Sequence, residues 1–77
     1  MSPREKAEIE VALTTAGHVS LRVVDVAGRE VAVLVDGERA AGTHRAVFQG
    51  HGLASGAYFA ILRQGDVTRT TRLVLLK

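Results

Sequence analysis

Eight glycines divide this 77-residue chain into short segments, and most of these segments alternate apolar and polar residues. An apolar residue at every second position places the apolar side chains on one face of a β-strand, whereas an amphipathic helix needs a spacing of three or four. The alternation is clear where Ile9, Val11 and Leu13 face away from Glu8 and Glu10. The segments predicted to be strands are residues 7–13, 18–24, 29–35, 43–49, 57–62 and 67–76.

The predicted strands also indicate which side chains form a core. The alternation is regular in segments 18–24 and 43–49, whereas segment 29–35 has apolar residues on both faces. The inward-facing residues are predicted to be Val19, Leu21 and Val23 in segment 18–24 and Val31, Val33 and Val35 in segment 29–35. Segment 43–49 alternates His44, Ala46 and Phe48 against Arg45 and Val47, with Phe48 predicted in the core. Segment 57–62 is apolar throughout, which is typical of a strand in the middle of a sheet. The pattern predicts an all-β, mostly antiparallel sandwich of six or seven strands.

Glycines and aspartates lie where the strands must reverse direction. Residues 25–28 are predicted to form a short hairpin loop in which Gly28 takes a left-handed conformation. Gly65 is predicted to occupy the first central position of a two-residue turn. The resulting cross-strand pairs would be Leu62 with Arg69, Ala60 with Thr71 and Tyr58 with Leu73. Asp25, Asp36 and Asp66 are each interpreted as turn residues whose carboxylates cap local amides.

Composition excludes several classes of protein. The absence of cysteine removes both a disulfide framework and a thiolate metal site. No apolar run approaches the roughly 18 residues of a membrane span, and no signal-peptide core follows the start. With 47% hydrophobic and 23% charged residues, the chain is expected to fold. Its length fits one small domain, predicted at residues 7–77 after a flexible lead-in at residues 1–6.

Three histidines are the first candidates for chemistry. As zinc ligands they would have to converge at about 2.1 Å from one ion. His18, His44 and His51 are predicted at different strand ends or loops, and their spacing matches no compact ligand set. No serine or threonine lies in a recognisable nucleophile motif, and no glycine-rich loop leads into a helix. We therefore expect no metal, no cofactor and no catalytic residue, so the protein is not expected to be an enzyme.

The formal charge of +2 and the isoelectric point of about 9.7 point first to nucleic acid as a partner. Arg63, Arg69 and Arg72 are predicted to line one side of the last hairpin. A single-stranded nucleic acid would also need aromatic side chains for stacking, but Phe48 and Tyr58 are predicted core residues. We interpret the arginines as a solvated face that opposes edge-to-edge aggregation, and no nucleic-acid partner is expected.

Several motifs occur in an order that is typical of one family. In chain order they are Ala16-Gly17-His18-Val19, Leu21-Arg22-Val23-Val24-Asp25, Gly28-Arg29-Glu30-Val31, Leu34-Val35-Asp36-Gly37, Gly42-Thr43-His44, Leu53-Ala54-Ser55-Gly56-Ala57-Tyr58-Phe59 and Arg72-Leu73-Val74-Leu75-Leu76-Lys77. Together they resemble the type A C-terminal sorting domain of the bacterial type IX secretion system. They are also similar to the related immunoglobulin-like domain of flagellar hook-capping proteins. The resemblance covers roughly residues 7–77.

The resemblance implies an immunoglobulin-like sandwich that carries a secretion signal instead of an active site. In that family an outer-membrane translocon recognises the domain at the end of a secreted cargo. A surface sortase-like protease then removes the domain and joins the cargo to lipopolysaccharide. A secreted or cell-surface location and an upstream cargo domain are implied, and a monomer without a membrane span is expected. The positions that match the family's motifs are Gly56 and Tyr58, the final Arg72, Leu73, Val74, Leu75, Leu76 and Lys77, and Gly28 and Arg29 in the first hairpin.

Two positions depart from the family pattern. The Asn-Pro motif usual before the first strand is absent, and only Ser2-Pro3 lies nearby. Thr14 and Thr15 replace a proline-containing turn that is common after that strand. The first departure leaves proteolytic processing unpredicted, and neither changes the expected fold.

The last strand has two interpretations. At a sheet edge, residues 73–76 would expose backbone groups and a small apolar patch that a partner's strand can extend. Alternatively, Leu73 and Leu75 are core, and the N-terminal segment covers Val74 and Leu76. For the whole domain, the alternatives to sorting are a carbohydrate-binding or adhesion module of a surface enzyme and a spacer without a signal. A single tyrosine and no tryptophan count against a sugar platform.

Overall fold

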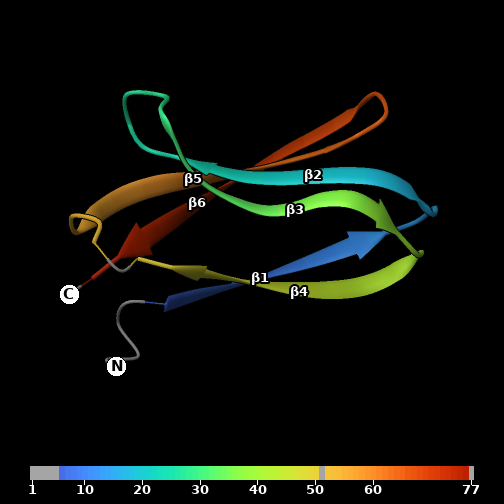
Figure 1. Cartoon of the computed structure of the whole chain (residues 1–77), viewed down its shortest axis with the longest axis horizontal. Coiled ribbons are helices and arrows are strands. Elements are labelled where there is room, and N and C mark those ends of the chain that lie inside the picture. Colours follow the sequence, from blue (N-terminus) through green and yellow to red (C-terminus); the bar gives the residue numbers. More distant parts are fainter. Residues whose placement is uncertain (1–5, 51, 77) are drawn as a thin grey trace.

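The protein folds into six antiparallel strands arranged in two sheets (Figure 1). The computed structural model describes residues 6–50 and 52–76, so residues 1–5 of the predicted lead-in lie outside the described residues. The strands are β1 (Lys6–Leu13), β2 (Gly17–Val24), β3 (Glu30–Arg39), β4 (Gly42–Gln49), β5 (Gly56–Gln64) and β6 (Val67–Leu75). The described residues contain no helix, and the predicted all-β fold is confirmed.

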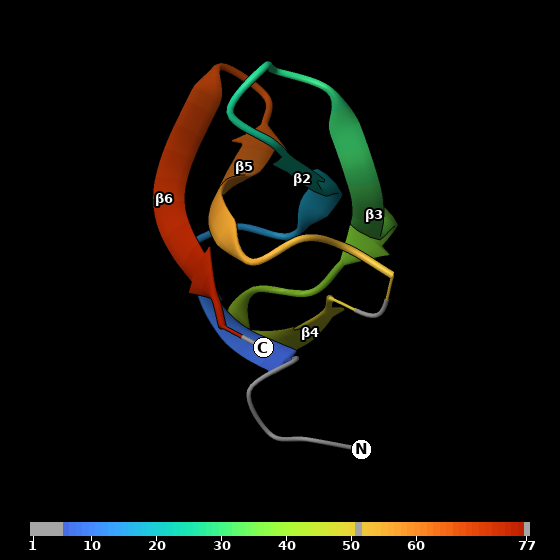
Figure 2. The ribbon, with the colours of Figure 1, turned by 90° about the vertical axis from the view of Figure 1, so that its left-hand side faces the viewer.

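The two sheets have the strand order of an immunoglobulin-like sandwich. One sheet pairs β1 with β4, and the other has the order β3-β2-β5-β6. These orders correspond to strands B–E and C′–C–F–G of the immunoglobulin fold, with no A or D strand in the described part of the chain. Figure 2 shows the four-stranded sheet curving over the two-stranded one, with β3 on one flank and β6 on the other. The predicted sandwich is confirmed, and β5 is a central strand as its apolar sequence predicts.

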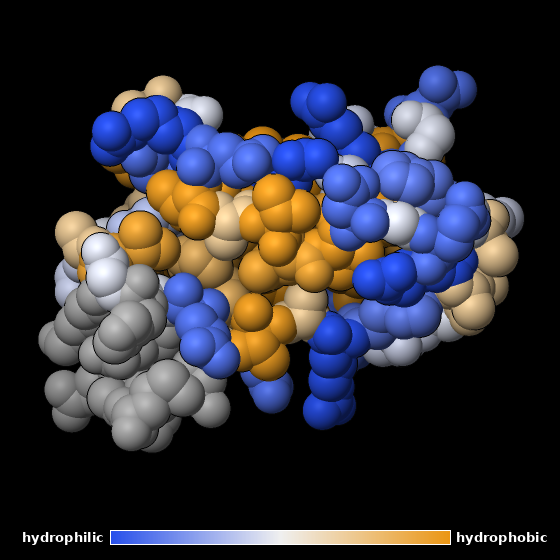
Figure 3. All heavy atoms as spheres, in the orientation of Figure 1, coloured by the Kyte–Doolittle hydropathy of each residue, from blue (hydrophilic) through white to orange (hydrophobic). Residues whose placement is uncertain are grey.

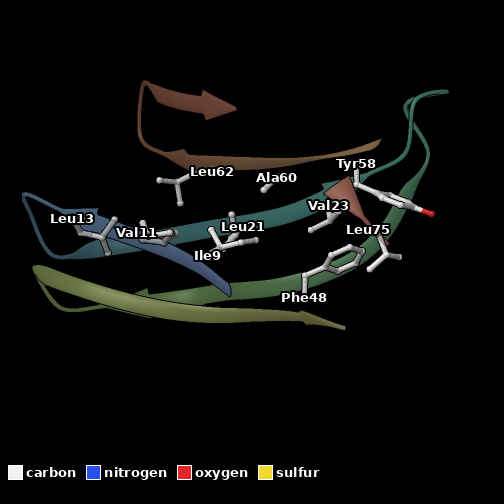
Figure 4. Packing of buried hydrophobic residues seen from close by; sticks show 11 residues of the cluster. Ile9, Val11, Leu13, Leu21, Val23, Phe48, Tyr58, Ala60, Leu62 and Leu75 are labelled. Atoms are coloured by element: carbon white, nitrogen blue, oxygen red, sulfur yellow. The ribbon is translucent and has the colours of Figure 1, made fainter. Parts of the chain in front are cut away.

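The alternating apolar residues meet between the sheets and form the core. Its buried members are Ile9, Val11, Leu13, Val19, Leu21, Val23, Phe48, Tyr58, Ala60, Leu62 and Leu75. At one end, Phe48, Tyr58 and Leu75 point toward one another from three different strands (Figure 4). The rings of Phe48 and Tyr58 lie 5.6 Å apart at an angle of 56°, a tilted arrangement that aromatic pairs favour. The predicted inward faces of β1 and β2 and the predicted core position of Phe48 on β4 are therefore confirmed.

β3 departs from the inward face of Val31, Val33 and Val35 that was predicted for it. Its pairing with β2 shifts register twice, between Leu21 and Arg22 and again between Val23 and Val24. Each shift leaves one extra β3 residue unpaired, as in a β-bulge, and changes which side chains face the core. Val33 is therefore 47% exposed, and the prediction that it faces the core is wrong.

β3 is also longer than predicted, because it continues through Asp36 and Gly37 to Arg39. Asp36 lies opposite Ser20 and Gly37 opposite Val19, so the interpretation of Asp36 as a turn residue is wrong. Aspartate and glycine favour turns locally, but here β2 provides a strand partner for both residues. Pairing with a neighbouring strand outweighs the local preference.

Both predicted hairpin turns form as their glycines require. Gly28 has a φ of +85°, and its N–H donates to the carbonyl oxygen of Asp25 at 3.0 Å. Gly65 has a φ of +57°, whereas Asp66 after it has no positive φ. This combination is that of a type II′ turn, which suits the twist of a hairpin. The predicted pairs of Leu62 with Arg69, Ala60 with Thr71 and Tyr58 with Leu73 are all present.

The Asp25 carboxylate holds the first hairpin together. Its Oδ1 accepts the backbone N–H groups of Ala27 and Arg29 at 2.9 Å each, and its Oδ2 accepts Nε of Arg29 at 3.0 Å. The backbone N–H of Arg29 is the main cause that lowers the pKa of Asp25, and the Arg29 side chain and the Ala27 N–H add to it. Arg29 thus has a structural contact in the turn.

We expect Asp25 to make stability depend on pH in the acid range. A carboxylate with a lowered pKa in the folded state stabilises the fold above the unfolded pKa of about 4. That contribution is lost as the pH falls through the lowered folded value. Asp25→Asn should therefore have a lower melting temperature at pH 7 and a weaker decline from pH 5 to pH 3, measured by circular dichroism. Asp66→Asn, in the other hairpin turn, is the matched control, and an unchanged decline in Asp25→Asn would contradict the prediction.

Candidate functional site

β6 lies at the edge of the four-stranded sheet and pairs only with β5 among the described strands. Its final residues separate into two faces. Leu75 is 2% exposed in the core and Leu73 is half-buried against it, whereas Val74 is 56% exposed and Leu76 is 61% exposed. The edge position and the exposed Val74 and Leu76 agree with the first interpretation of this strand. The core positions of Leu73 and Leu75 agree with the second.

The first part of β6 is exposed on both faces. Every residue from 67 to 72 is exposed, including those whose side chains point to the same side as Leu73 and Leu75. The reason is the shape of the sandwich. The two-stranded sheet approaches β6 mainly through β1, near the end of β6, and the β5–β6 hairpin extends beyond it (Figure 2). This part of β6 therefore contributes little to the core.

The open side of β6 carries backbone groups that pair with no strand in the described part of the chain. In an antiparallel ladder that starts at a two-residue turn, alternate residues direct N–H and C=O toward the partner strand. Because Gln64 pairs with Val67, the residues of β6 that direct these groups away from β5 are Thr68, Thr70, Arg72 and Val74. Such a row of donors and acceptors is a template for an additional strand.

The charges of the molecule are distributed unevenly over the strands. The ion pairs are His18–Asp36 at 3.2 Å, Arg22–Glu30 at 2.8 Å, Arg22–Asp36 at 3.8 Å, Arg29–Asp25 at 3.0 Å and Arg45–Glu10 at 3.7 Å. Four of these five join β2, β3 and their connecting turn. The hydrogen bond to Glu30 is the main cause that raises the pKa of Arg22. Arg63, Arg69 and Arg72 are exposed and form no ion pair within the described residues.

Gly56 and Tyr58 lie on β5 and support β6 from its paired side. Gly56 lies opposite Leu75, and Tyr58 lies opposite Leu73. Tyr58 is 6% exposed, and its hydroxyl donates a 2.7 Å hydrogen bond to the carbonyl oxygen of Ala54. A tyrosine at the start of this strand that bonds a backbone group a few residues upstream is a feature of immunoglobulin-like domains. The predicted core position of Tyr58 is confirmed.

The remaining site residues of the sequence analysis fall in three places. Gly28, Arg29 and Gly65 form turns, as described above. Lys77 and His51 lie outside the described residues. The other two histidines bind separate partners, since His18 pairs with Asp36 and Nε2 of His44 lies 2.7 Å from the carbonyl oxygen of Ala40. Within residues 6–50 and 52–76, no three histidine, aspartate or glutamate side chains gather in a way that could hold a metal ion.

Two hollows lie in the surface of the described chain at opposite ends of the sandwich. One has a volume of about 640 Å³ between the β2–β3 turn and the loop before β5. The other, of about 430 Å³, lies between the β1–β2 turn and the β5–β6 turn, where Nε2 of Gln64 donates to the carbonyl oxygen of Thr15 at 2.8 Å. Both are open to solvent and are lined mainly by turn residues. No helix able to cross a membrane occurs in the described segments.

The structure has an apolar surface between β3 and β4 that was not predicted from the sequence. Figure 3 shows apolar side chains gathered across the middle of the molecule, between β3 above and β4 below. The apolar residues of these two strands that pack partly buried against the core are Val31, Ala32, Leu34, Val35 and Ala46. Val33 and Val47 are 47% and 43% exposed but lie on the outer faces of the two sheets, opposite Arg22 and Glu8. The signal in the sequence was the apolar character of both faces of β3, but the register shifts that decide which of its residues lie beside the core depend on its pairing with β2.

Comparisons with protein-family models, with curated proteins and with solved structures find no match to this chain. The family resemblance of its motifs therefore stays a prediction.

Proposed function

We propose that this domain is a non-catalytic sorting module that directs the protein carrying it across the bacterial outer membrane through the type IX system. Its partners would be the outer-membrane translocon, a surface sortase-like protease and an upstream cargo domain, and its location the cell surface or the exterior. The observation that carries the proposal is the exposed edge strand β6. Val74 in this strand and Leu76 directly after it are more than half exposed, at positions that match the family's final motif.

The two faces of β6 give its residues separate roles in this proposal. Leu75 stabilises the sandwich, because its side chain is almost fully buried between the sheets. Val74 and Leu76 add little to stability, because more than half of each residue is in contact with water. Exposed apolar side chains beside an open strand edge are suited to contact with another protein. Substitutions on the two faces can therefore separate folding from recognition.

The test is export of a reporter fused to this domain in a bacterium with a type IX system. Val74→Asp and Leu76→Asp are expected to abolish surface display while the melting temperature changes little, because surface substitutions usually shift stability by less than about 0.5 kcal/mol. Val26→Asp is the matched control, since Val26 is 76% exposed in the β2–β3 turn far along the chain from β6. Normal export of both β6 variants, or an equal loss in Val26→Asp, would refute the proposal.

A carbohydrate-binding module is less well supported by the positions of the aromatic residues. Sugar platforms present aromatic rings to solvent. Phe48 and Tyr58 are buried here, and the hydroxyl of Tyr58 is already bonded to Ala54. Phe59, on the outer face of β5, is half-buried beside Arg72. A titration with soluble glycans separates the two functions, because measurable saccharide binding would favour the carbohydrate module.

A further inference from the structure

The β5–β6 hairpin combines three features that bear on what its open edge can bind. Its outer strand has, at alternate residues, backbone donors and acceptors that no described strand pairs with. Its residues from 67 to 72 are exposed on both faces, so that a partner can approach from either side. Its three arginines have no ion-pair partner in the described part of the chain, whereas those of β2 and its turn are paired. The open edge of the sheet at β6 is therefore also positively charged, through Arg63, Arg69 and Arg72.

The arginines of β6 lie on opposite faces of the sheet, so the prediction that Arg63, Arg69 and Arg72 line one side of the hairpin is wrong. Phe59 pairs with Arg72 and Leu62 pairs with Arg69, and Leu62 points to the core whereas Phe59 points outward. Arg69 is therefore on the inner side and Arg72 on the outer side, three residues apart. An added strand would run about 4.8 Å from β6 and place its alternate side chains beside both. Arg63 lies on the outer face of β5, one strand further in.

We propose that the open edge of β6 binds an extended, acidic segment of a partner protein, which adds to the sheet as a fifth strand. Backbone hydrogen bonds to Thr68, Thr70, Arg72 and Val74 provide the pairing. Two carboxylates spaced three residues apart meet Arg69 and Arg72 from the two faces, and an apolar residue packs beside Val74. This inference deepens the proposed function by naming the chemistry of the recognised segment, and it rests on that function for the identity of the partner.

The probe is a synthetic peptide with blocked ends and the sequence Val-Thr-Glu-Thr-Thr-Glu-Thr-Val. It reads the same in both directions, so its two glutamates match Arg69 and Arg72 in a parallel or an antiparallel strand. Titrated into the isotopically labelled protein, it is expected to shift the amide signals of Thr68, Thr70, Arg72 and Val74 most and to slow their hydrogen exchange. The peptide with lysine in place of both glutamates is expected to bind about tenfold more weakly, because it cannot form the two exposed ion pairs with Arg69 and Arg72.

Charge reversal on the protein gives the matched test. Arg69→Glu/Arg72→Glu is expected to reverse the preference, so that the lysine peptide binds more tightly than the glutamate peptide. Arg39→Glu/Arg45→Glu changes the net charge by the same amount on β3 and β4 and is expected to keep the wild-type preference. Equal binding of the two peptides, binding of neither, or signal shifts centred on β3 or β4 would overturn the inference.

Export of the same variants separates this inference from the proposed function. Arg69→Glu/Arg72→Glu is expected to reduce surface display of a fused reporter, and Arg39→Glu/Arg45→Glu is not. If display depends on Val74 but not on the two arginines, the acidic strand is wrong and the sorting function stands. If the glutamate peptide binds but neither set of substitutions affects display, the sorting function is wrong, and the edge binds an acidic segment in another role.

Discussion

Leu75→Ala is expected to lower the free energy of unfolding by about 2–5 kcal/mol, the usual cost of removing a buried leucine side chain. Leu75 is 2% exposed and closes the end of the core near Phe48 and Tyr58 (Figure 4). Urea denaturation followed by circular dichroism measures the change. Val74→Ala, one residue earlier on the opposite face of β6, is the control and should change stability by less than about 0.5 kcal/mol. Equal stability of the two variants would contradict the assigned orientation of β6.

A second substitution tests the same contact from the other side. A Cβ atom added to Gly50 would lie 2.9 Å from Cγ of Leu75 and closer still to both of its methyl carbons. Gly50→Ala is therefore expected to cost about 1–3 kcal/mol by overpacking. In the double variant with Leu75→Ala the clash is gone, so the double cost should be clearly less than the sum of the two single costs. Simple additivity would show that the two residues do not meet.

Proline substitutions at Thr70 and Thr71 are expected to have very different effects although the residues are neighbours. Thr71 pairs with Ala60 in the part of the ladder where backbone groups point toward β5. Thr71→Pro loses that hydrogen bond and leaves a carbonyl of the central strand unpaired, which together cost about 2–4 kcal/mol. Thr70→Pro removes an N–H that points to the open edge, a position that tolerates proline.

Thermal melts of both proline variants measure this difference. Thr71→Pro should melt far below the wild type, whereas Thr70→Pro should stay close to it and also lose affinity for the acidic peptide. The reverse order of stabilities would mean that the open edge of β6 carries the other set of backbone groups. The assignment of the edge donors would then be wrong.

The sequence predicted those parts of the fold that depend on local chemistry. Gly28 and Gly65 occupy backbone conformations that a side chain resists, so their turns could be placed from the sequence. The register of the β5–β6 hairpin followed from the two-residue length of its turn. The inward face of β2 followed from its alternation, because a strand has only two faces.

The errors fall where a residue's environment depends on a distant strand. Val33 is exposed because β3 bulges against β2, and a bulge cannot be recognised from β3 alone. Asp36 lies in a strand because β2 pairs with it, against its own preference for turns. The candidate site shows the same division. The apolar final strand was visible in the sequence. That Arg69 and Arg72 form no ion pair within residues 6–50 and 52–76, whereas Arg22 of β2 pairs with β3, became apparent only from the structure.

The pairing of β1 with β4 also determines how the domain reaches its folded state. The strands are separated along the chain by residues 14–41, which include two other strands. Contacts of this long-range kind make small β-sandwiches fold in milliseconds to seconds, whereas a hairpin such as β5–β6 forms in microseconds. The β5–β6 hairpin, which carries the cationic open edge, can thus form and unfold many times before the two sheets pack together around Leu75.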